Sequence, residues 1–160
     1  MADAALDALY QEVILDHNRR PRNYHAMEHA TCSADGKNPN CGDALTVWLK
    51  VSDDVIDDIS FQGVGCAISK ASASLMTLAV KGKTRADAER VFGKVHRLVT
   101  GEEPALATDK EMGALRALGG VSKFPMRVKC ASLSWHAMKA ALDGTRETTT
   151  EDADSRGGAS

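Results

Sequence analysis

Two neighbouring stretches of the chain alternate between apolar and polar residues. The apolar positions are Leu45, Val47, Leu49 and Val51 in the first stretch and Val55, Ile59 and Phe61 in the second. A period of two is typical of a β-strand with one buried face. The turn-forming residues Ser-Asp-Asp at 52–54 separate the stretches, so we predict an antiparallel hairpin over 44–62. The stretch 29–34 gives a weaker indication of a third strand.

Five further segments show helical periodicity or helix start and stop signals. They are expected at about 6–20, 66–80, 84–99, 108–118 and 130–142. Thr84 with Asp87, and Thr108 with Glu111, resemble capping boxes at the starts of two of these helices. Because strands come first and most helices follow, we predict an α+β fold. It should contain a small antiparallel sheet of about three strands, with about five helices packed on one face.

The length of 160 residues suits one domain, which we place at 1–144. Residues 145–160 contain only two alanines as apolar residues. A segment of this composition cannot bury enough apolar surface to fold. We therefore expect a disordered acidic and polar tail.

The charge balance excludes some classes of partner. Lys and Arg number 20 and Asp and Glu number 22, which gives a net charge of −2 with both signs scattered along the chain. This balance argues against a nucleic-acid-binding surface or an anionic-membrane surface. Acidic residues interrupt the N-terminal segment, and no apolar run is long enough to span a membrane. We expect a cytoplasmic protein.

Three of the four cysteines lie where a loop meets a predicted element. Cys41 lies in the turn-rich sequence NPNCGD, just before the first clear strand. Cys66 follows Gly-Val-Gly, and Cys130 follows the cations Arg127 and Lys129. Cys66 and Cys130 are placed at predicted helix starts, where free backbone N–H groups favour a thiolate. We therefore expect low pKa values for these two thiols.

Junctions at one end of a sheet can converge in space, and Asp43 could lie on the same side as Cys41 in an extended chain. Three thiolates and one carboxylate form a tetrahedral set suited to zinc or to an iron–sulfur cluster. There is no C-x-x-C motif. Spacing alone therefore leaves open that each cysteine is a small buried hydrophobe. We adopt that interpretation for Cys32, which has no glycine or cationic neighbour, and favour metal ligands for the other three.

None of the five histidines is predicted to be a ligand. His17 lies on the apolar face of the first helix and is expected to be a hydrogen-bonded core residue. His136 follows Cys130 by six residues, which places it off the helical face of that cysteine. The other three have no cysteine-rich surroundings.

Several motifs resemble those of the U-type iron–sulfur cluster assembly scaffolds. They are YQEVILDH at 10–17, PRN at 21–23, NPNCGD at 38–43 and GVGCAISKASAS at 63–74. In the IscU branch of this superfamily a histidine precedes the last cysteine and joins the ligand set. Here that residue is Lys129, which cannot act as a neutral ligand without losing its proton. The segment GVSKFPMRVKCASLSWH at 120–136, and the helical stretch before it, are similar to the SufU branch instead.

The resemblance to SufU implies a zinc site formed by Cys41, Asp43, Cys66 and Cys130, with a [2Fe–2S] cluster or iron as the alternative occupant. It also implies a SufS-type cysteine desulfurase as the partner that supplies persulfide sulfur, with downstream iron–sulfur assembly proteins as recipients. We expect Cys41 to accept the sulfur because it lies on the most turn-like segment. The chain is then a sulfurtransferase partner without independent catalytic activity.

Other interpretations stay open. Arg127 and Lys129 could guide an acidic partner or bind a persulfide anion, but an ordinary solvated basic stretch explains them equally well. The chain could be a scaffold on which a [2Fe–2S] cluster is assembled, or an interaction module with a purely structural zinc. A cysteine hydrolase would need a Cys–His pair, and no motif in the sequence indicates one.

Overall fold

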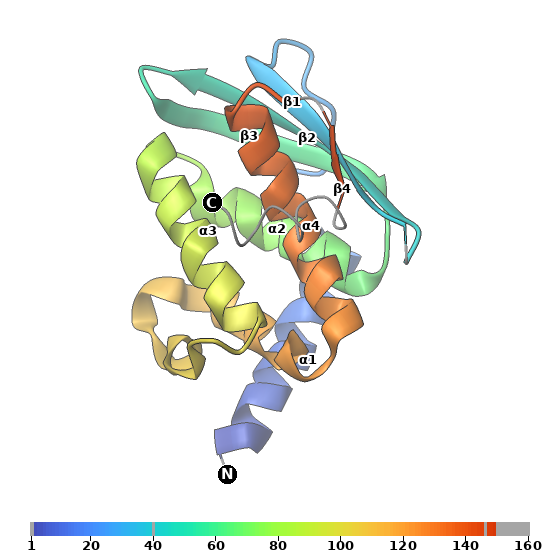
Figure 1. Ribbon diagram of the computed structural model, residues 1–160, viewed down its shortest axis with the longest axis vertical. Helices are drawn as coiled ribbons and strands as arrows, with labels where there is room; N and C mark the ends of the chain where they lie inside the picture. Colours follow the sequence, from blue (N-terminus) through green and yellow to red (C-terminus); the bar gives the residue numbers. More distant parts are fainter. Residues whose placement is uncertain (1, 40, 146, 150–160) are drawn as a thin grey trace.

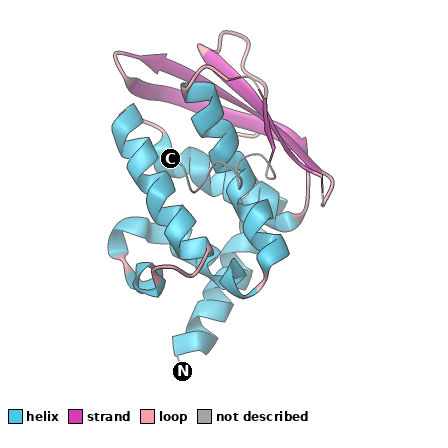
Figure 2. Cartoon of the chain, in the orientation of Figure 1, coloured by secondary structure: helices cyan, strands magenta, loops and turns pink. Residues whose placement is uncertain are grey.

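The computed structural model describes residues 2–39, 41–145 and 147–149. In chain order the elements are α1 (Ala2–Arg19), β1 (Cys32–Asn38), β2 (Asp43–Ser52), β3 (Val55–Val64), α2 (Ala67–Val80), α3 (Arg85–Val99), the 3-10 helices η1 (Pro104–Thr108) and η2 (Lys110–Lys123), α4 (Pro125–Leu142) and β4 (Glu147–Thr149). A small sheet lies on one side, and the helices pack together on its inner face (Figures 1 and 2). The predicted α+β class is confirmed. None of the helices in the described part of the chain is long and apolar enough to cross a membrane.

The sheet has the strand order β3-β2-β1-β4. It contains the predicted antiparallel hairpin of β2 and β3, closed where Ser52 pairs with Val55, with β3 at one edge. Asp53 and Asp54 both have positive φ angles, 52° and 68°. Two successive residues of this kind form the turn whose twist matches that of the flanking strands. The hairpin prediction is confirmed.

The predicted third strand is present but lies further along the chain than expected, as β1 rather than 29–34. Its sequence carries little apolar signal because α4 packs closely on it at Gly36. A Cβ added to Gly36 would lie 3.1 Å from Leu133 and 3.2 Å from Ala137, both on α4. At this position of β1 the alternation pattern would call for an apolar side chain, but a glycine is present because α4 comes too close to leave room for one.

β4 adds a strand that the sequence patterns do not indicate. It runs parallel to β1, so the sheet is mixed rather than wholly antiparallel. Residues 147–149 of the expected disordered tail are therefore ordered by strand pairing. The rest of that tail, apart from Thr145, lies outside the described residues.

Several helix boundaries differ from prediction, and α1 begins at Ala2 rather than near residue 6. Thr84 caps α3 by accepting a hydrogen bond from the backbone N–H of Asp87, as expected. The cap of η2 is Asp109 rather than Thr108, and the segment kinks at Gly113 and continues past Gly119-Gly120 to Lys123. α4 begins at Pro125, five residues before the expected start at Cys130, because proline suits the first helical position.

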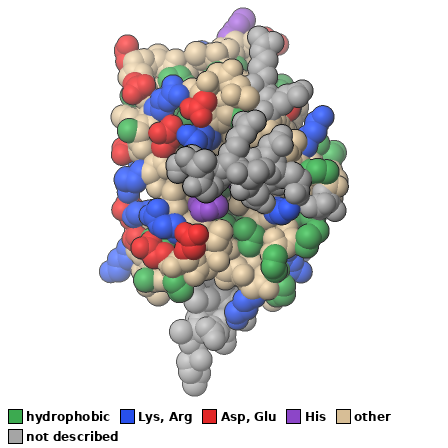
Figure 3. Space-filling model, viewed as in Figure 1, with side chains coloured by type: hydrophobic (Ala, Val, Ile, Leu, Met, Phe, Trp, Pro, Cys, Tyr) green, Lys and Arg blue, Asp and Glu red, His purple; other side chains and the backbone are tan. Residues whose placement is uncertain are grey.

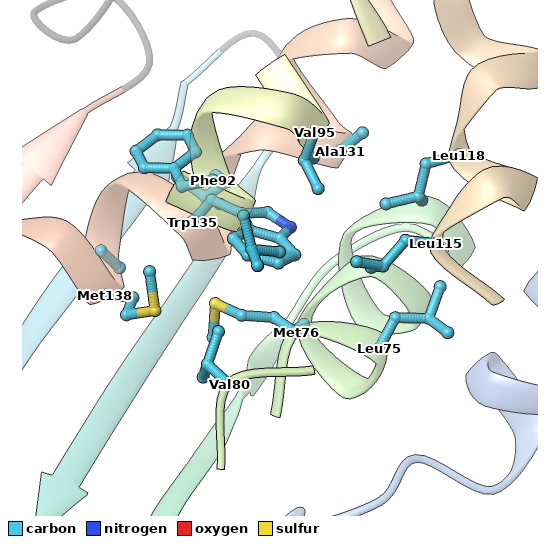
Figure 4. Close-up of a cluster of buried hydrophobic side chains, with 14 of the residues drawn as sticks. Leu75, Met76, Val80, Phe92, Val95, Leu115, Leu118, Ala131, Trp135 and Met138 are labelled. Atoms are coloured by element: carbon cyan, nitrogen blue, oxygen red, sulfur yellow. The ribbon is translucent and has the colours of Figure 1, made fainter. Parts of the chain in front are cut away.

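The core lies between the sheet and the helices and is centred on Trp135 of α4 (Figure 4). The Trp135 side chain is fully buried, and its ring stacks with that of Phe92 at a centroid distance of 6.1 Å. Its indole N–H donates to Ser72 Oγ at 3.1 Å, and the Ser72 hydroxyl donates to the carbonyl of Ala131 at 2.6 Å. A buried indole needs such a partner. These bonds tie α2 to α4.

Charged side chains of both signs are interspersed on the side of the molecule formed by α3 (Figure 3). Part of this pattern is a set of ion pairs between α3 and η2. Glu111 accepts from Arg90 at 2.6 Å and from Lys94 at 2.9 Å. These two hydrogen-bonded cations lower the pKa of Glu111 to about 2.

We predict that Glu111→Gln lowers the melting temperature at neutral pH. A carboxylate whose pKa is lowered by folding stabilises the folded state above its unfolded pKa, and this contribution is lost as pH falls toward the folded pKa. The difference between wild type and variant should therefore shrink as pH falls from 4.5 toward about 2. Thermal unfolding followed by circular dichroism over this range measures it. A difference that stays constant with pH would contradict the prediction.

Candidate metal centre

Three predicted ligand residues meet at one end of the sheet. β1 ends at Asn38 and β2 begins at Asp43, and these two residues pair across the strands. The connection between them carries Cys41, and α4 brings Cys130 to the same place. The ligand atoms of Cys41, Asp43 and Cys130 all lie within 4.8 Å of one another. The sulfur atoms of Cys41 and Cys130 are 3.5 Å apart.

Cys66 borders this group. It is the N-cap residue of α2, and its backbone N–H donates to Asp43 Oδ1 at 2.9 Å. Its sulfur is a hydrogen-bond partner of the Cys130 thiol and lies 3.5 Å from Ser69 Oγ. The structure thus brings Cys41, Asp43 and Cys130 together, and Cys66 adjoins them through its contacts with Asp43 and Cys130.

Cys66 and Cys130 differ in ionisation. The hydrogen bond from Cys130, with help from Ser69, lowers the pKa of Cys66 to about 5. Hydrogen bonds to Cys66 and burial raise the pKa of Cys130. The expectation of a low pKa at Cys130 is therefore wrong. Because α4 begins at Pro125, Cys130 lies in the second helical turn, away from the free N–H groups, and only 3% of it is exposed.

The carboxylate of Asp43 is 2% exposed and accepts three hydrogen bonds. Besides the N–H of Cys66, the donors are Ser69 Oγ at 2.7 Å and Asn38 Nδ2 at 3.3 Å, both to Oδ2. Gly65 leaves room for this carboxylate, since a Cβ there would lie 2.9 Å from Asp43 Oδ1. The contacts of Asn38 and Ser69 with Asp43 were not predicted from the sequence. The only available signal was their place inside the cysteine motifs.

The cations beside the cysteine of α4 lie near the start of that helix. Arg127 is exposed, and its guanidinium lies 4.6 Å from the centroid of the Phe124 ring. Lys129 is half-buried. Large apolar side chains are also exposed around the ends of these elements, namely Val64, Phe124 and Met126. That the two cations face a partner stays a prediction.

The residues set aside in the sequence analysis lie apart from the cluster. Cys32 is half-buried on β1, packs against the core and has a pKa raised by burial. His17 is buried and hydrogen-bonds through Nδ1 to Ser74 Oγ at 2.7 Å, which confirms a satisfied core histidine. The ring of His136 packs edge-on against Phe92 at 5.1 Å.

The model of the NifU-like N-terminal domain matches residues 9–144. The chain belongs to this family. It is 42% identical over 143 residues to the zinc-dependent sulfurtransferase SufU of Bacillus subtilis, covering 88% of this chain and 93% of that protein. It is 41% identical to the iron–sulfur cluster assembly scaffold protein IscU of Streptococcus pyogenes, covering 89% and 87% of the two chains.

Solved structures of this NifU-like family have the same fold. A crystal structure described as a putative iron–sulfur cluster assembly scaffold protein for the SUF system, from Fervidobacterium islandicum, superposes with a TM-score of 0.75 at 32% identity. It covers 84% of this chain and 97% of that one. The predicted resemblance to U-type scaffolds is confirmed, and the chain is a member of the SufU and IscU group of iron–sulfur cluster assembly proteins.

We predict that iodoacetamide modifies Cys66 and Cys41 well before Cys130 and Cys32 in the reduced, metal-free protein. Cys41 and Cys66 are exposed, whereas Cys130 is buried and holds its proton. A time course with peptide mass spectrometry measures the four rates. Urea-unfolded protein is the control, in which the rates should converge. Modification of folded Cys130 as fast as Cys66 would contradict the assignment.

Proposed function

We propose that this protein is a zinc-binding sulfur carrier in iron–sulfur cluster assembly, and that Cys41 receives sulfur from a SufS-type cysteine desulfurase. The observation that carries the proposal is that the exposed Cys41 lies beside the buried Asp43 and Cys130, with ligand atoms within 4.8 Å of one another, and that Cys66 borders this group. The 42% identity to a protein named zinc-dependent sulfurtransferase supports it.

The donor atoms fit zinc. Cys41, Asp43, Cys66 and Cys130 offer three soft sulfurs and one oxygen, and zinc in proteins takes four such ligands. Asp43 accepts three hydrogen bonds, and a carboxylate has about four acceptor sites, so one is left for a metal ion. Bound there, zinc would supply a positive charge that keeps the thiols deprotonated.

Cys41 is the best placed of the three thiols to meet a partner. Cys130 is buried beneath it, and Cys66 is anchored at the start of α2 by its backbone bond to Asp43. Cys41 is exposed, and a Cβ added at the adjacent Gly42 would contact nothing within 4 Å. Only Cys41 therefore combines exposure with open space around its backbone.

The proposed transfer is a displacement at sulfur. The deprotonated sulfur of Cys41 attacks the outer sulfur of the persulfide on the desulfurase. A new S–S bond forms at Cys41 while the S–S bond of the donor breaks, and the donor cysteine leaves as a thiolate with the electron pair. No external oxidant or reductant is needed. Arg127 and Lys129 would attract the persulfide anion or acidic groups of the partner.

A second candidate function is that of a scaffold for a [2Fe–2S] cluster, passed on to downstream assembly proteins. The 41% identity to a protein named IscU favours it, and the same four residues would hold the cluster. Metal analysis with a visible spectrum separates the two candidates, because zinc is colourless and a cluster is coloured. A purely structural zinc fits less well, since structural sites are closed and Cys41 is exposed.

We predict that zinc raises the melting temperature of wild type and of Cys32→Ser, but not of Cys130→Ser. A ligand at 100 times its Kd stabilises the folded state by about 2.7 kcal/mol. For a chain of this size that corresponds to roughly 5–10 °C. Thermal unfolding with and without zinc, together with metal analysis, tests this. Stoichiometric zinc on Cys130→Ser with an undiminished shift would exclude Cys130 as a ligand.

We also predict that wild type accelerates turnover of a SufS-type desulfurase and that Cys41→Ser does not. The reason is that the enzyme-bound persulfide then has no acceptor thiol. Desulfurase rates and intact mass, which detects one added sulfur, measure the effect. Cys32→Ser is the matched control and should behave as wild type. Equal stimulation by Cys41→Ser would rule out Cys41 as the acceptor.

A further inference from the structure

Two buried polar side chains lie between the proposed ligand residues. The first is Asn38, the last residue of β1. Its Nδ2 donates to Asp43 Oδ2 at 3.3 Å and points to the sulfur of Cys130 at 3.6 Å. Its carbonyl accepts the backbone N–H of Cys41 at 3.2 Å. Asn38 therefore contacts three of the four proposed ligand residues.

The second side chain is Ser69, in the first turn of α2. Its hydroxyl donates to Asp43 Oδ2 at 2.7 Å and lies 3.5 Å from the sulfur of Cys66. Both Asn38 and Ser69 are completely buried. Each of them links the carboxylate of Asp43 to one thiol, Asn38 on the Cys130 side and Ser69 on the Cys66 side.

We propose that Asn38 and Ser69 are positioning residues that fix the carboxylate of Asp43 between the thiols and thereby set the metal affinity of the centre. This inference rests on the proposed function, because it requires a metal ion on these four residues. A carboxylate that is already oriented loses less side-chain freedom when it binds a metal ion. Hydrogen-bond partners of metal ligands commonly change metal affinity by about 10–100-fold.

The space around the carboxylate supports this role. Gly65 precedes Cys66, and a Cβ there would lie 3.1 Å from the Cβ of Ser69 as well as 2.9 Å from Asp43 Oδ1. The backbone at Gly65 therefore lies close to the side chains of Ser69 and Asp43, and a side chain at position 65 would collide with both. The orientation of Asp43 is thus limited on one side by backbone and on the other by the two donors.

The test uses the full chain with Co²⁺ as a spectroscopic probe and a chelator competition for zinc. Ser69→Ala should lower zinc affinity roughly 10–100-fold. Its cobalt complex should keep the thiolate-to-metal absorption but change the visible ligand-field bands that report on the oxygen ligand. Ser72→Ala is the matched control, because Ser72 lies in the same helix, is buried and hydrogen-bonds to Ala131 and Trp135 rather than to a proposed ligand residue. It should lower the melting temperature while affinity and spectrum stay as in wild type.

A double-mutant cycle shows whether Ser69 acts through Asp43. In an Asp43→Ala background, the further change Ser69→Ala should leave zinc affinity unchanged. Losses that add, or a Ser69→Ala variant with the affinity and spectrum of wild type, would overturn the inference while leaving the proposed function intact. A wild-type protein without thiolate-to-cobalt absorption would overturn both.

Discussion

The buried carboxylate of Asp43 is the group on which the geometry of the candidate centre depends. A carboxylate removed from water needs hydrogen-bond donors from the protein. Its donors come from the end of β1, through Asn38, and from the start of α2, through Cys66 and Ser69. Satisfying one charge therefore requires that the sheet and α2 meet at this point. The thiols carried by these segments are brought together by the same requirement.

Because the three thiols differ in burial, they differ in whether they can contact another protein. Cys130 is 3% exposed and shares hydrogen bonds with the other two sulfurs, so it is suited to binding and not to meeting a partner. Cys66 is exposed but fixed at a helix N-terminus. Cys41 is exposed on the connection between two strands. A carrier needs this combination, since it must hold its site together while one sulfur reacts with another protein.

The parts of the fold that the sequence predicts well are those whose signals are local. The hairpin of β2 and β3 has a regular apolar period, and α3 has an apolar face and the predicted Thr84 cap. β1 could not be placed in this way, because Gly36 exchanges an apolar side chain for contact with α4. β4 is ordered by pairing with a strand more than a hundred residues earlier in the chain.

The candidate site likewise has features with local sequence signals and features that depend on long-range packing. That Cys41, Asp43 and Cys130 come close together, with Cys66 beside them, could be predicted from residue type and from their place at junctions. The ionisation of Cys130 could not, because it depends on where α4 begins and on which sulfurs lie beside it. The roles of Asn38 and Ser69 arise only when β1 and α2 are packed together. The sequence alone does not show which residue a polar side chain in a strand or an α-helix will hydrogen-bond to when that residue lies on another element.

The motifs at 10–17 and 21–23 lie outside the segments that carry the proposed ligands, yet they bear on the site through α2. His17 and the backbone N–H of Arg22 both hydrogen-bond to the hydroxyl of Ser74, and Asn23 donates to Thr77. These contacts hold the C-terminal half of α2 against α1 and the segment that follows it. The N-terminal end of the same helix carries a proposed metal ligand and is held by the carboxylate. Because an α-helix of this length is stiff, anchoring it at both ends fixes the thiol at its start relative to the sheet.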